Sequence, residues 1–345
     1  MAGIVFSKAS GVNDSIFGKS QEPIRALIES QIEAFEKGRS ALNKVYAMES
    51  TDKFAEKFTS ETSLGNFAPV GEAGAYPENG FQEGYSKVVE PDTWKNAFEV
   101  TMEMAEDASY GKVKQRVSAF TLSYNRTREL FGAALLGGGM NGSVTFGSGV
   151  HARQFSTKCA DGKSLFATDH PSITNGYGNQ SNLFADAFSY DALCYAQERM
   201  QDLRDDDGNL LGVSPDTILI PNDAMLKKQV FNAIGAEGLP DTHQHSMNFQ
   251  YGLWNVIVWP YLNQFLPKDA TSKPWILIDS EFNKAYFGAI WLERVKLTVR
   301  SEIAGNDNNV FKGRARYSAG FNNWRPFAIS YTGSGGTALV PASGS

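Results

Sequence analysis

The sequence predicts an α+β fold, in which helices and strands occupy largely separate parts of the chain. Three observations support this fold class: a long amphipathic helical pattern over residues 113–134, a strand-rich stretch from residue 250 onward, and a Gly/Pro-rich stretch over 60–92 without an apolar stripe. The chain has 345 residues, of which 42% are apolar, so it can bury a substantial core. Its length fits two ordinary domains or one elaborate one.

The first predicted helix covers residues 20–47, after a loose polar arm over residues 1–19. Ser20 can cap it, and Pro23 suits its first turn. Gly38 is expected to break or bend it. One apolar stripe follows the helical period: Ile24, Leu27, Ile28, Ile32 and Phe35.

An extension is predicted over residues 60–92, because this stretch is rich in Gly, Pro and Glu and has no buried stripe of its own. Beyond Pro91, the residues Trp94, Phe98, Val100 and Met102 share one face of a strand. We expect the two stretches to form a long hairpin. A hairpin without a core of its own is marginal in a monomer.

The longest helix is predicted by apolar residues at steps of three and four over about seven turns, and GGGMNG at 137–142 ends it. A second helix covers 185–204, and a short buried strand lies in VSPDTILIP. Asn222 or Asp223 is expected to cap the next helix, which Gly235 ends. Further strands are expected in WNVIVWP, WILID, AYFGAIWL, RVKLTVRSEI and the segment from residue 309, and the final GSGGTALVPASGS is expected to be disordered.

Composition excludes several classes of protein. The net charge is −6, so a broad phosphate-binding face is not expected. No run of 18 apolar residues indicates a membrane span. Cys159 and Cys194 lie 35 residues apart, which fits neither a zinc site nor a redox motif, and both are expected to be reduced thiols in a cytoplasmic setting.

One strand, in NVFKGRARYSAGF at 309–321, carries alternating cations. Lys312, Arg314 and Arg316 point to one side, while Phe311 and Tyr317 point to the other. Basic residues mixed with aromatics occur in nucleic-acid sites, but the acidic chain argues against that role. A solvated face and a contact with acidic groups of another copy stay open.

Candidate catalytic or metal-binding residues are few. His243 and His245 share a strand face and could bind a metal with further ligands, or belong to a polar loop. The neighbours Asp169 and His170 should point apart before Pro171, so we expect a turn there. The segment 205–209, DDDGN, lacks calcium-loop spacing, and GGGMNGS lacks the Lys of a phosphate loop. We therefore predict no enzyme, no catalytic or metal-binding residue and no cofactor.

The order of these parts resembles the major capsid proteins of tailed bacteriophages, which have the HK-97-type fold. Four patterns carry the resemblance: GYSKVVEPDTWKNAFEVTMEMAEDA at the end of the extended loop, SPDTILIPNDAMLKKQVFNAI at the entry to the axial domain, WNVIVWPYL with KPWILIDSEF as its central strands, and DNNVFKGRARYSAGFNNWRPF as the return strand pair. The resemblance covers residues 60–330.

The resemblance implies a division of the chain into six parts. They are an N-terminal arm (1–60), an extended-loop hairpin (61–104), a peripheral domain with the spine helix (105–213), a strand-rich axial domain (214–300), a return to the peripheral domain (301–333) and a flexible tail (334–345).

The function that the resemblance implies is a structural head protein that self-assembles, as hexamers and pentamers, into an icosahedral shell around double-stranded phage DNA without sequence specificity. Portal and scaffolding proteins are expected partners, with assembly in the host cytoplasm and a final place in the virion capsid. Contacts between subunits are expected at Phe81, Tyr85, Lys87, Trp94, Lys312, Arg314 and Arg316. The alternatives are an encapsulin-like bacterial cargo compartment of the same fold and a metal-dependent enzyme that uses His243 and His245.

Overall fold

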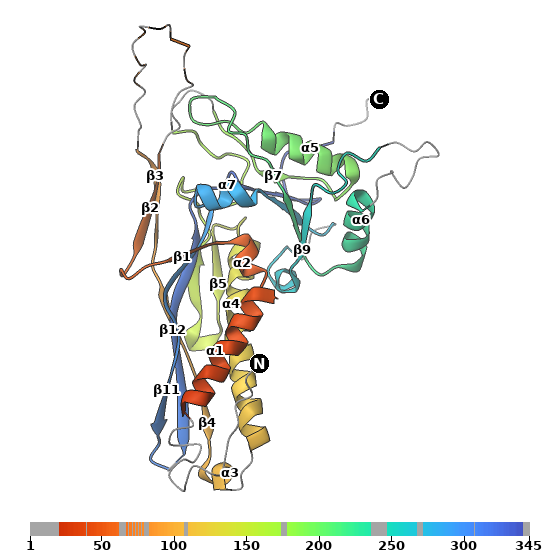
Figure 1. Ribbon diagram of the computed structural model, residues 1–345. Helices are drawn as coiled ribbons and strands as arrows, with labels where there is room; N and C mark the ends of the chain where they lie inside the picture. Colours follow the sequence, from red (N-terminus) through yellow and green to blue (C-terminus); the bar gives the residue numbers. More distant parts are fainter. Residues whose placement is uncertain are drawn as a thin grey trace.

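Two separate sheets organise the chain in the computed structural model (Figure 1). The structure describes residues 21–340, apart from residue 39, most of 62–82, and residues 107–109, 174–177, 236–246, 268–271 and 307. One sheet is long and lies beside two helices, and the other is short, with helices around it.

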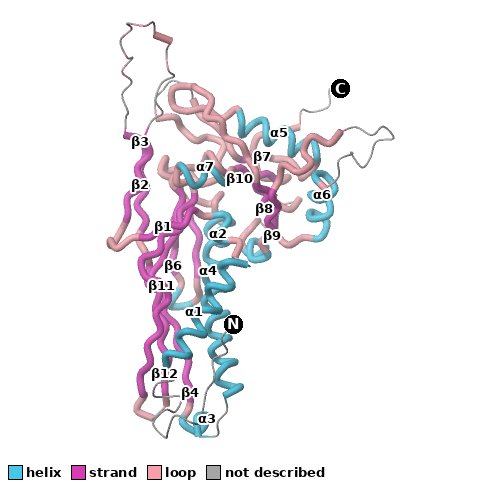
Figure 2. The backbone as a smooth tube through the Cα atoms, viewed as in Figure 1, coloured by secondary structure: helices cyan, strands magenta, loops and turns pink. Residues whose placement is uncertain are grey.

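The long sheet has four strands in the order β1 (Ala47–Ser50), β11 (Ala289–Ile303), β12 (Asn309–Phe321) and β4 (Asp92–Val100). Strand β12 pairs antiparallel with both β11 and β4, and β1 runs parallel to β11. Figure 2 shows α1 (Gln21–Gly38) and α4 (Tyr110–Gly137) running along this sheet. Their shared core is a cluster of apolar side chains: Ile28, Val100, Val113, Val117, Phe120, Val299 and Phe311.

A glycine allows the close approach of α4 to this sheet. A Cβ atom built on Gly313 of β12 would lie 2.4 Å from the ring of Phe120 on α4. That distance is far below a van der Waals contact. The glycine between Lys312 and Arg314 is therefore required by the packing of the helix on the strand.

The short sheet has five strands and forms the centre of the larger core cluster. Their order is β7 (Leu183–Phe184), β13 (Phe327–Ser330), β10 (Trp275–Ile278), β8 (Thr217–Ile220) and β9 (Asn255–Val258). Every residue of β8, β10 and β13 is buried, as expected for strands covered on both faces. Three helices surround the sheet: α5 (Tyr190–Gln201), α6 (Ala224–Ile234) and α7 (Ser280–Ala285).

Two hairpins and several short helices complete the described part of the chain. The hairpin of β2 (Glu56–Glu61) and β3 (Glu83–Val89) lies at one end of the molecule, and β5 (Ser143–Phe146) pairs with β6 (Arg153–Ser156). The short helices are α2 (Leu42–Val45), α3 (Met102–Glu106) and the 3-10 turns η2 (Gly149–His151) and η3 (Pro260–Gln264).

Several predicted elements are confirmed. The long helix α4 covers the predicted stripe, and α1 ends at Gly38. Helix α6 begins at a cap in which the Asp223 carboxylate accepts hydrogen bonds from the backbone N–H groups of Met225 and Leu226, and it ends at Gly235. Within the described residues, no helix is both long enough and apolar enough to cross a membrane.

Other predictions about the bounds and pairing of helices and strands were wrong. Met102 lies in α3 and not on a strand, and the helix expected through residue 47 gives way to α2 and β1. Strand β4 pairs with β12, so it is not an arm of the hairpin, whose paired strands are β2 and β3. Helix α7 was missed, although Asp279 caps it by accepting from the backbone N–H of Phe282, and a single bulged β11 replaces two predicted strands.

Candidate functional site

The extension carries three of the residues predicted to contact other subunits. Phe81 lies outside the described residues. Tyr85 is half-buried on β3 and lines a cavity of about 460 Å³ between the base of the hairpin and α7. The ammonium group of Lys87 donates to the carbonyl of Lys158 at 2.7 Å, and partial burial lowers the pKa of this lysine. Lys87 is thus bound within its own chain.

Trp94, which the sequence analysis assigned to a contact with a neighbouring subunit, has aromatic partners within its own chain. Its ring is stacked on that of Tyr317, and it also contacts three phenylalanine rings. The partners of Trp94 in this cluster are Phe131, Phe146 and Phe155. These contacts come from four other elements, α4, β5, β6 and β12, so the pattern of β4 alone did not reveal them.

The cations of β12 belong to a wider basic surface. Alternation along β12 is confirmed: Lys312 and Arg314 are exposed, between buried neighbours. Arg316 is only half-exposed, and its guanidinium donates to the carbonyl of Pro91 at 3.4 Å. In the sheet, Arg300 of β11 lies opposite Lys312, and Lys95 of β4 lies opposite Arg314.

We call Lys95, Arg300, Lys312 and Arg314 the cationic face; together they line one groove of about 650 Å³. Like charges directly opposite each other in a sheet are destabilising. Glu302, the one acidic residue of the groove, forms an ion pair with Lys312. The arrangement therefore suits an acidic partner. Sequence reasoning missed Lys95 and Arg300. The segment RVKLTVRSEI nevertheless carries cations at the even-numbered residues 294, 296 and 300.

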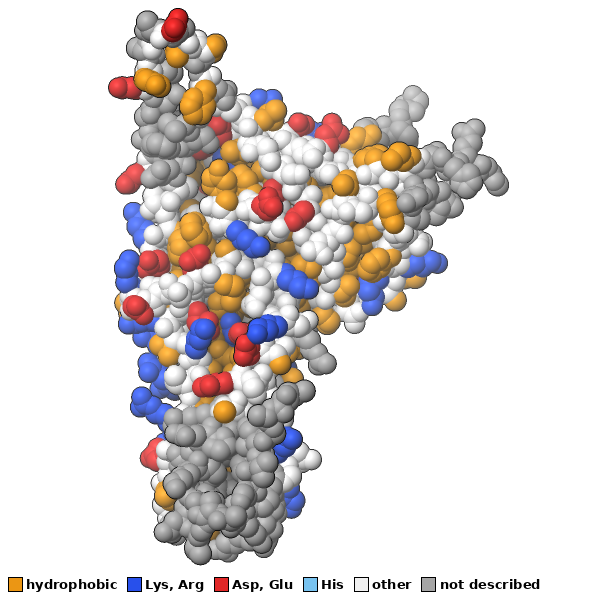
Figure 3. Space-filling model, viewed as in Figure 1, with side chains coloured by type: hydrophobic (Ala, Val, Ile, Leu, Met, Phe, Trp, Pro, Cys, Tyr) orange, Lys and Arg blue, Asp and Glu red, His pale blue; other side chains and the backbone are white. Residues whose placement is uncertain are grey.

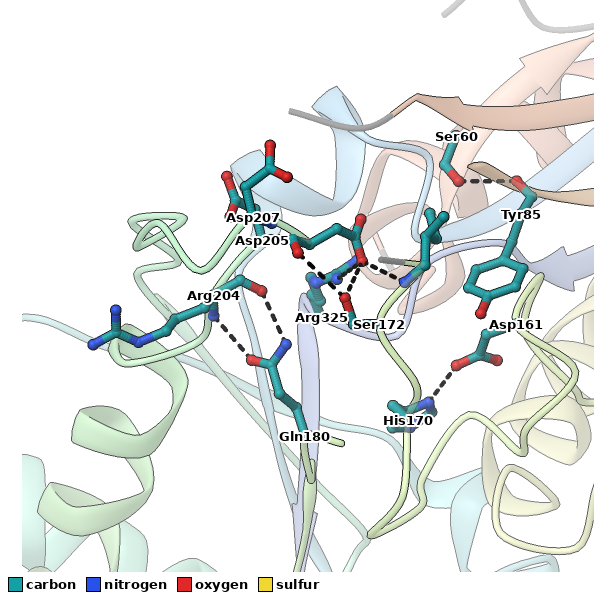
Figure 4. A network of polar contacts seen from close by, with 12 residues as sticks. Ser60, Tyr85, Asp161, His170, Ser172, Gln180, Arg204, Asp205, Asp207 and Arg325 are labelled. Atoms are coloured by element: carbon teal, nitrogen blue, oxygen red, sulfur yellow. Dashed lines mark hydrogen bonds and ion pairs between the residues drawn. The ribbon is translucent and has the colours of Figure 1, made fainter. Parts of the chain in front are cut away.

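Of the two neighbouring residues that had suggested catalysis, His170 belongs to a buried structural network (Figure 4). Asp169 pairs with Lys163 at the surface, whereas the adjacent His170 is fully buried, so the predicted divergence of these neighbours is confirmed. The Nδ1 atom of His170 lies 2.6 Å from a carboxylate oxygen of Asp161. The imidazole is stacked on the indole of Trp324, with ring centroids 4.1 Å apart.

The amide of Asn182 fixes the orientation of the His170 ring. Its nitrogen donates to the carbonyls of Leu165 and Phe327 at 2.8 and 2.9 Å, and its oxygen accepts from the backbone N–H of Ala167. This oxygen also lies 3.2 Å from Nε2 of His170. The oxygens of Asn182 and Asp161 thus face the two ring nitrogens, and both are hydrogen-bond acceptors, so the imidazole serves as a donor in the core.

The acidic turn at 205–209 is also structural. The carboxylate of Asp205 accepts from the backbone N–H groups of Asp207 and Asn209, which closes the predicted turn. Asp206 accepts from the backbone N–H of Ile173 and faces Arg325 at 3.6 Å. Burial lowers the pKa of Arg325, and the neighbouring carboxylates oppose that shift.

The described part of the chain contains neither a metal-binding cluster nor a cysteine with a lowered thiol pKa. No group of three His, Cys, Asp or Glu residues there could hold a metal ion, and His243 and His245 lie outside it. Both cysteines are free, and burial raises the pKa of each thiol. A raised pKa disfavours the reactive thiolate.

The comparisons with known proteins agree with a structural role. The model of a family described as phage capsid protein matches residues 84–330. The fold is similar to a chain of the bacteriophage PhiM1 mature capsid, with a TM-score of 0.53 and 7% identity over 86% of this chain and 87% of that chain. It is also similar to a chain from Mycobacterium phage Patience, with a TM-score of 0.50 and 10% identity over 92% and 88%. Among curated proteins, none matches the sequence.

Proposed function

The chain belongs to the phage capsid protein family, and from that premise we propose how its copies join and what their shell contains. Membership confirms the predicted function, a major capsid protein that forms the icosahedral shell of a tailed phage, and it confirms the place in the virion. The protein is structural and not an enzyme. The HK-97-type fold is confirmed by the two similar structures. Self-association of the chain into a shell follows from membership of the family. What we propose is which surfaces of the chain make the contacts between copies.

The exposed extension is the observation that carries this proposal. Phe67 and Tyr76 lie between β2 and β3, and their side chains are 104% and 91% exposed. Aromatic side chains of this size contribute strongly to interfaces once they are buried. We assign the extension, with Tyr85 at its base, to a contact across a neighbouring copy. Phe81 stays in this proposal on its sequence position alone.

The cationic face provides a second contact with another copy. Its exposed cations gain from acidic groups opposite them, and an acidic chain of net charge −6 offers many such groups. Figure 3 shows Lys and Arg side chains gathered along one edge of the molecule. Lys312 and Arg314 remain in the proposal from the sequence, and Lys95 and Arg300 join them.

The remaining features of the proposal concern the whole shell. Hexamers and pentamers of this chain enclose double-stranded DNA without sequence specificity, since a container that bound DNA tightly would resist its ejection. Portal and scaffolding proteins take part in assembly in the host cytoplasm. The division into arm, extended loop, peripheral domain, axial domain, return segment and tail describes the subunit in outline, except that β4 and β11 both belong to the long sheet with β12.

Electron microscopy of the purified full chain tests the proposal. Closed, uniform shells are expected, and nuclease-protected double-stranded DNA inside particles from infected cells would separate a phage head from a protein-filled compartment. Particles that contain protein cargo and no DNA would favour the encapsulin-like alternative. A chain that stays monomeric or forms only small oligomers across salt and crowding conditions would contradict the shell itself.

A further inference from the structure

Residues 247–253 show the reverse of the usual burial pattern. Met247, Phe249 and Leu253 are 86%, 59% and 54% exposed, whereas Asn248 and Gln250 between them are 3% and 0% exposed. Tyr251 is also exposed, at 47%. The backbone turns over residues 249–252, where the N–H of Tyr251 donates to the carbonyl of Asn248 at 3.2 Å, and the segment keeps its two polar side chains inward and its apolar ones outward.

Hydrogen bonds of the two buried amides hold the segment in this orientation. The side-chain nitrogen of Asn248 donates to the carbonyl of Ala233 at 2.7 Å. The side-chain nitrogen of Gln250 donates to the side-chain oxygen of Gln197 at 2.8 Å. The side-chain oxygen of Gln250 accepts from the indole N–H of Trp254 at 2.6 Å. A shift by one residue would break these bonds and bury the amides unpaired, at a cost of roughly 1–3 kcal/mol for each group. The apolar side chains are therefore fixed on the outside.

Together with Phe231 of α6, which is 52% exposed, these four apolar side chains form what we call the outer apolar patch: Phe231, Met247, Phe249, Tyr251 and Leu253. The bond from Asn248 to Ala233 joins the segment to the end of α6. Figure 3 shows hydrophobic side chains gathered over this end of the molecule. From typical side-chain areas, the patch presents roughly 400–500 Å² of apolar surface.

An area of this size matches one side of a protein interface. A standard interface buries about 800 Å² on each partner, of which somewhat more than half is apolar. Large apolar patches on a soluble subunit mark contacts with other molecules. Scattered single residues, such as the exposed Leu122 of α4, need no such explanation.

We infer that the outer apolar patch is a contact surface between copies of this chain in the shell, which rests on the shell function proposed above. Every copy of the chain carries the patch. To cover the patch on every copy of a closed shell, a partner must be present in the same number as the chain. A second copy of the chain always meets this condition. DNA gains little from an apolar surface, because its affinity comes from phosphate contacts. Figure 1 places α6 far from the lower ends of β11 and β12, so this contact is distinct from that of the cationic face.

Photo-crosslinking in assembled particles tests the inference. Phe249 is replaced by p-benzoylphenylalanine, which keeps an aromatic ring at the position, and particles built from this full-length chain are irradiated. We expect covalent dimers of the chain, with the second site identified by mass spectrometry. The same chain dissociated to subunits should give no dimer. Crosslinks to a different protein, or no crosslinks in well-formed particles, would overturn the inference.

A pair of substitutions gives an independent measurement. The double variant Phe249→Ser, Leu253→Ser should lower particle yield about tenfold or more, because central apolar contacts carry most of the energy of an interface. Its subunits should unfold at the wild-type temperature, since exposed positions change stability little. The control Leu122→Ser should keep the wild-type yield. Wild-type yield of the double variant would refute this contact alone, whereas a wild-type chain without particles would refute the shell function.

Discussion

The indole of Trp94 lies parallel to the ring of Tyr317, with centroids 5.0 Å apart, and its N–H donates to the Tyr317 backbone carbonyl at 2.9 Å. The stack joins β4 to β12 beneath α4. The strand that follows the extension is thus anchored in its own subunit. Within the extension, we therefore assign the contact with a neighbouring copy to the β2–β3 hairpin and the residues between its strands.

Replacement of Trp94 by Ala should lower the free energy of unfolding of the isolated subunit by about 3 kcal/mol, because a large partly buried ring and its hydrogen bond are lost. Chemical denaturation measures the loss. Trp94→Phe, which keeps most of the ring packing, should cost only about 1 kcal/mol. If Trp94→Ala left the subunit as stable as wild type and blocked assembly, Trp94 would be an interface residue after all.

The buried pair of Asp161 and His170 should matter to folding and not to any reaction. Asp161→Asn replaces the carboxylate that faces the buried imidazole and should destabilise the subunit by about 1–3 kcal/mol, seen as a lower melting temperature. The matched control is Asp169→Asn, which removes the exposed partner of Lys163 and should cost at most about 1 kcal/mol. Equal effects of the two substitutions would show that the buried network has no special weight.

Charge reversal of the cationic face should block assembly without unfolding the subunit. The variant Arg300→Glu, Arg314→Glu changes two exposed residues and spares the half-buried Arg316. Its particle yield by light scattering should fall strongly, and high salt should weaken wild-type assembly through screening. The charge-conserving control Arg300→Lys, Arg314→Lys should assemble.

The same variants test the nucleic-acid reading of this face. If wild-type subunits bound DNA with a steep salt dependence, and the Glu variant lost that binding while it assembled normally, the face would be a nucleic-acid site.

Removal of residues 65–80, with a Gly-Gly link that leaves β2 and β3 intact, should give a folded subunit that cannot close a shell. The removed residues include Phe67 and Tyr76, whose side chains are exposed in the subunit, so the loss of these two aromatic rings takes nothing from the core. Circular dichroism should match wild type, and electron microscopy should show no closed particles. Unfolding of this variant would mean that the extension stabilises its own subunit.

The sequence by itself determined the elements whose signals are local. The stripe of α4 repeats over many turns, the alternation of β12 separates cations from core side chains, and Asp223 caps α6. Each of these patterns is carried by residues close together in the chain, and burial of one face makes the period visible. The resemblance of their order to phage capsid proteins was enough to predict the family, which the comparisons confirmed.

Only the tertiary structure decided which distant residues meet. Strand register places Arg300 beside Lys312 and Lys95 beside Arg314, which turns a row of cations into a face. Trp94 finds its partner 223 residues away. The outward side chains of 247–253 are set by bonds from Asn248 and Gln250 to α6 and α5, so the inverted pattern could not be interpreted from its own residues. Long-range pairing carries no local period, and for that reason the surfaces proposed to join the subunits became visible only in the fold.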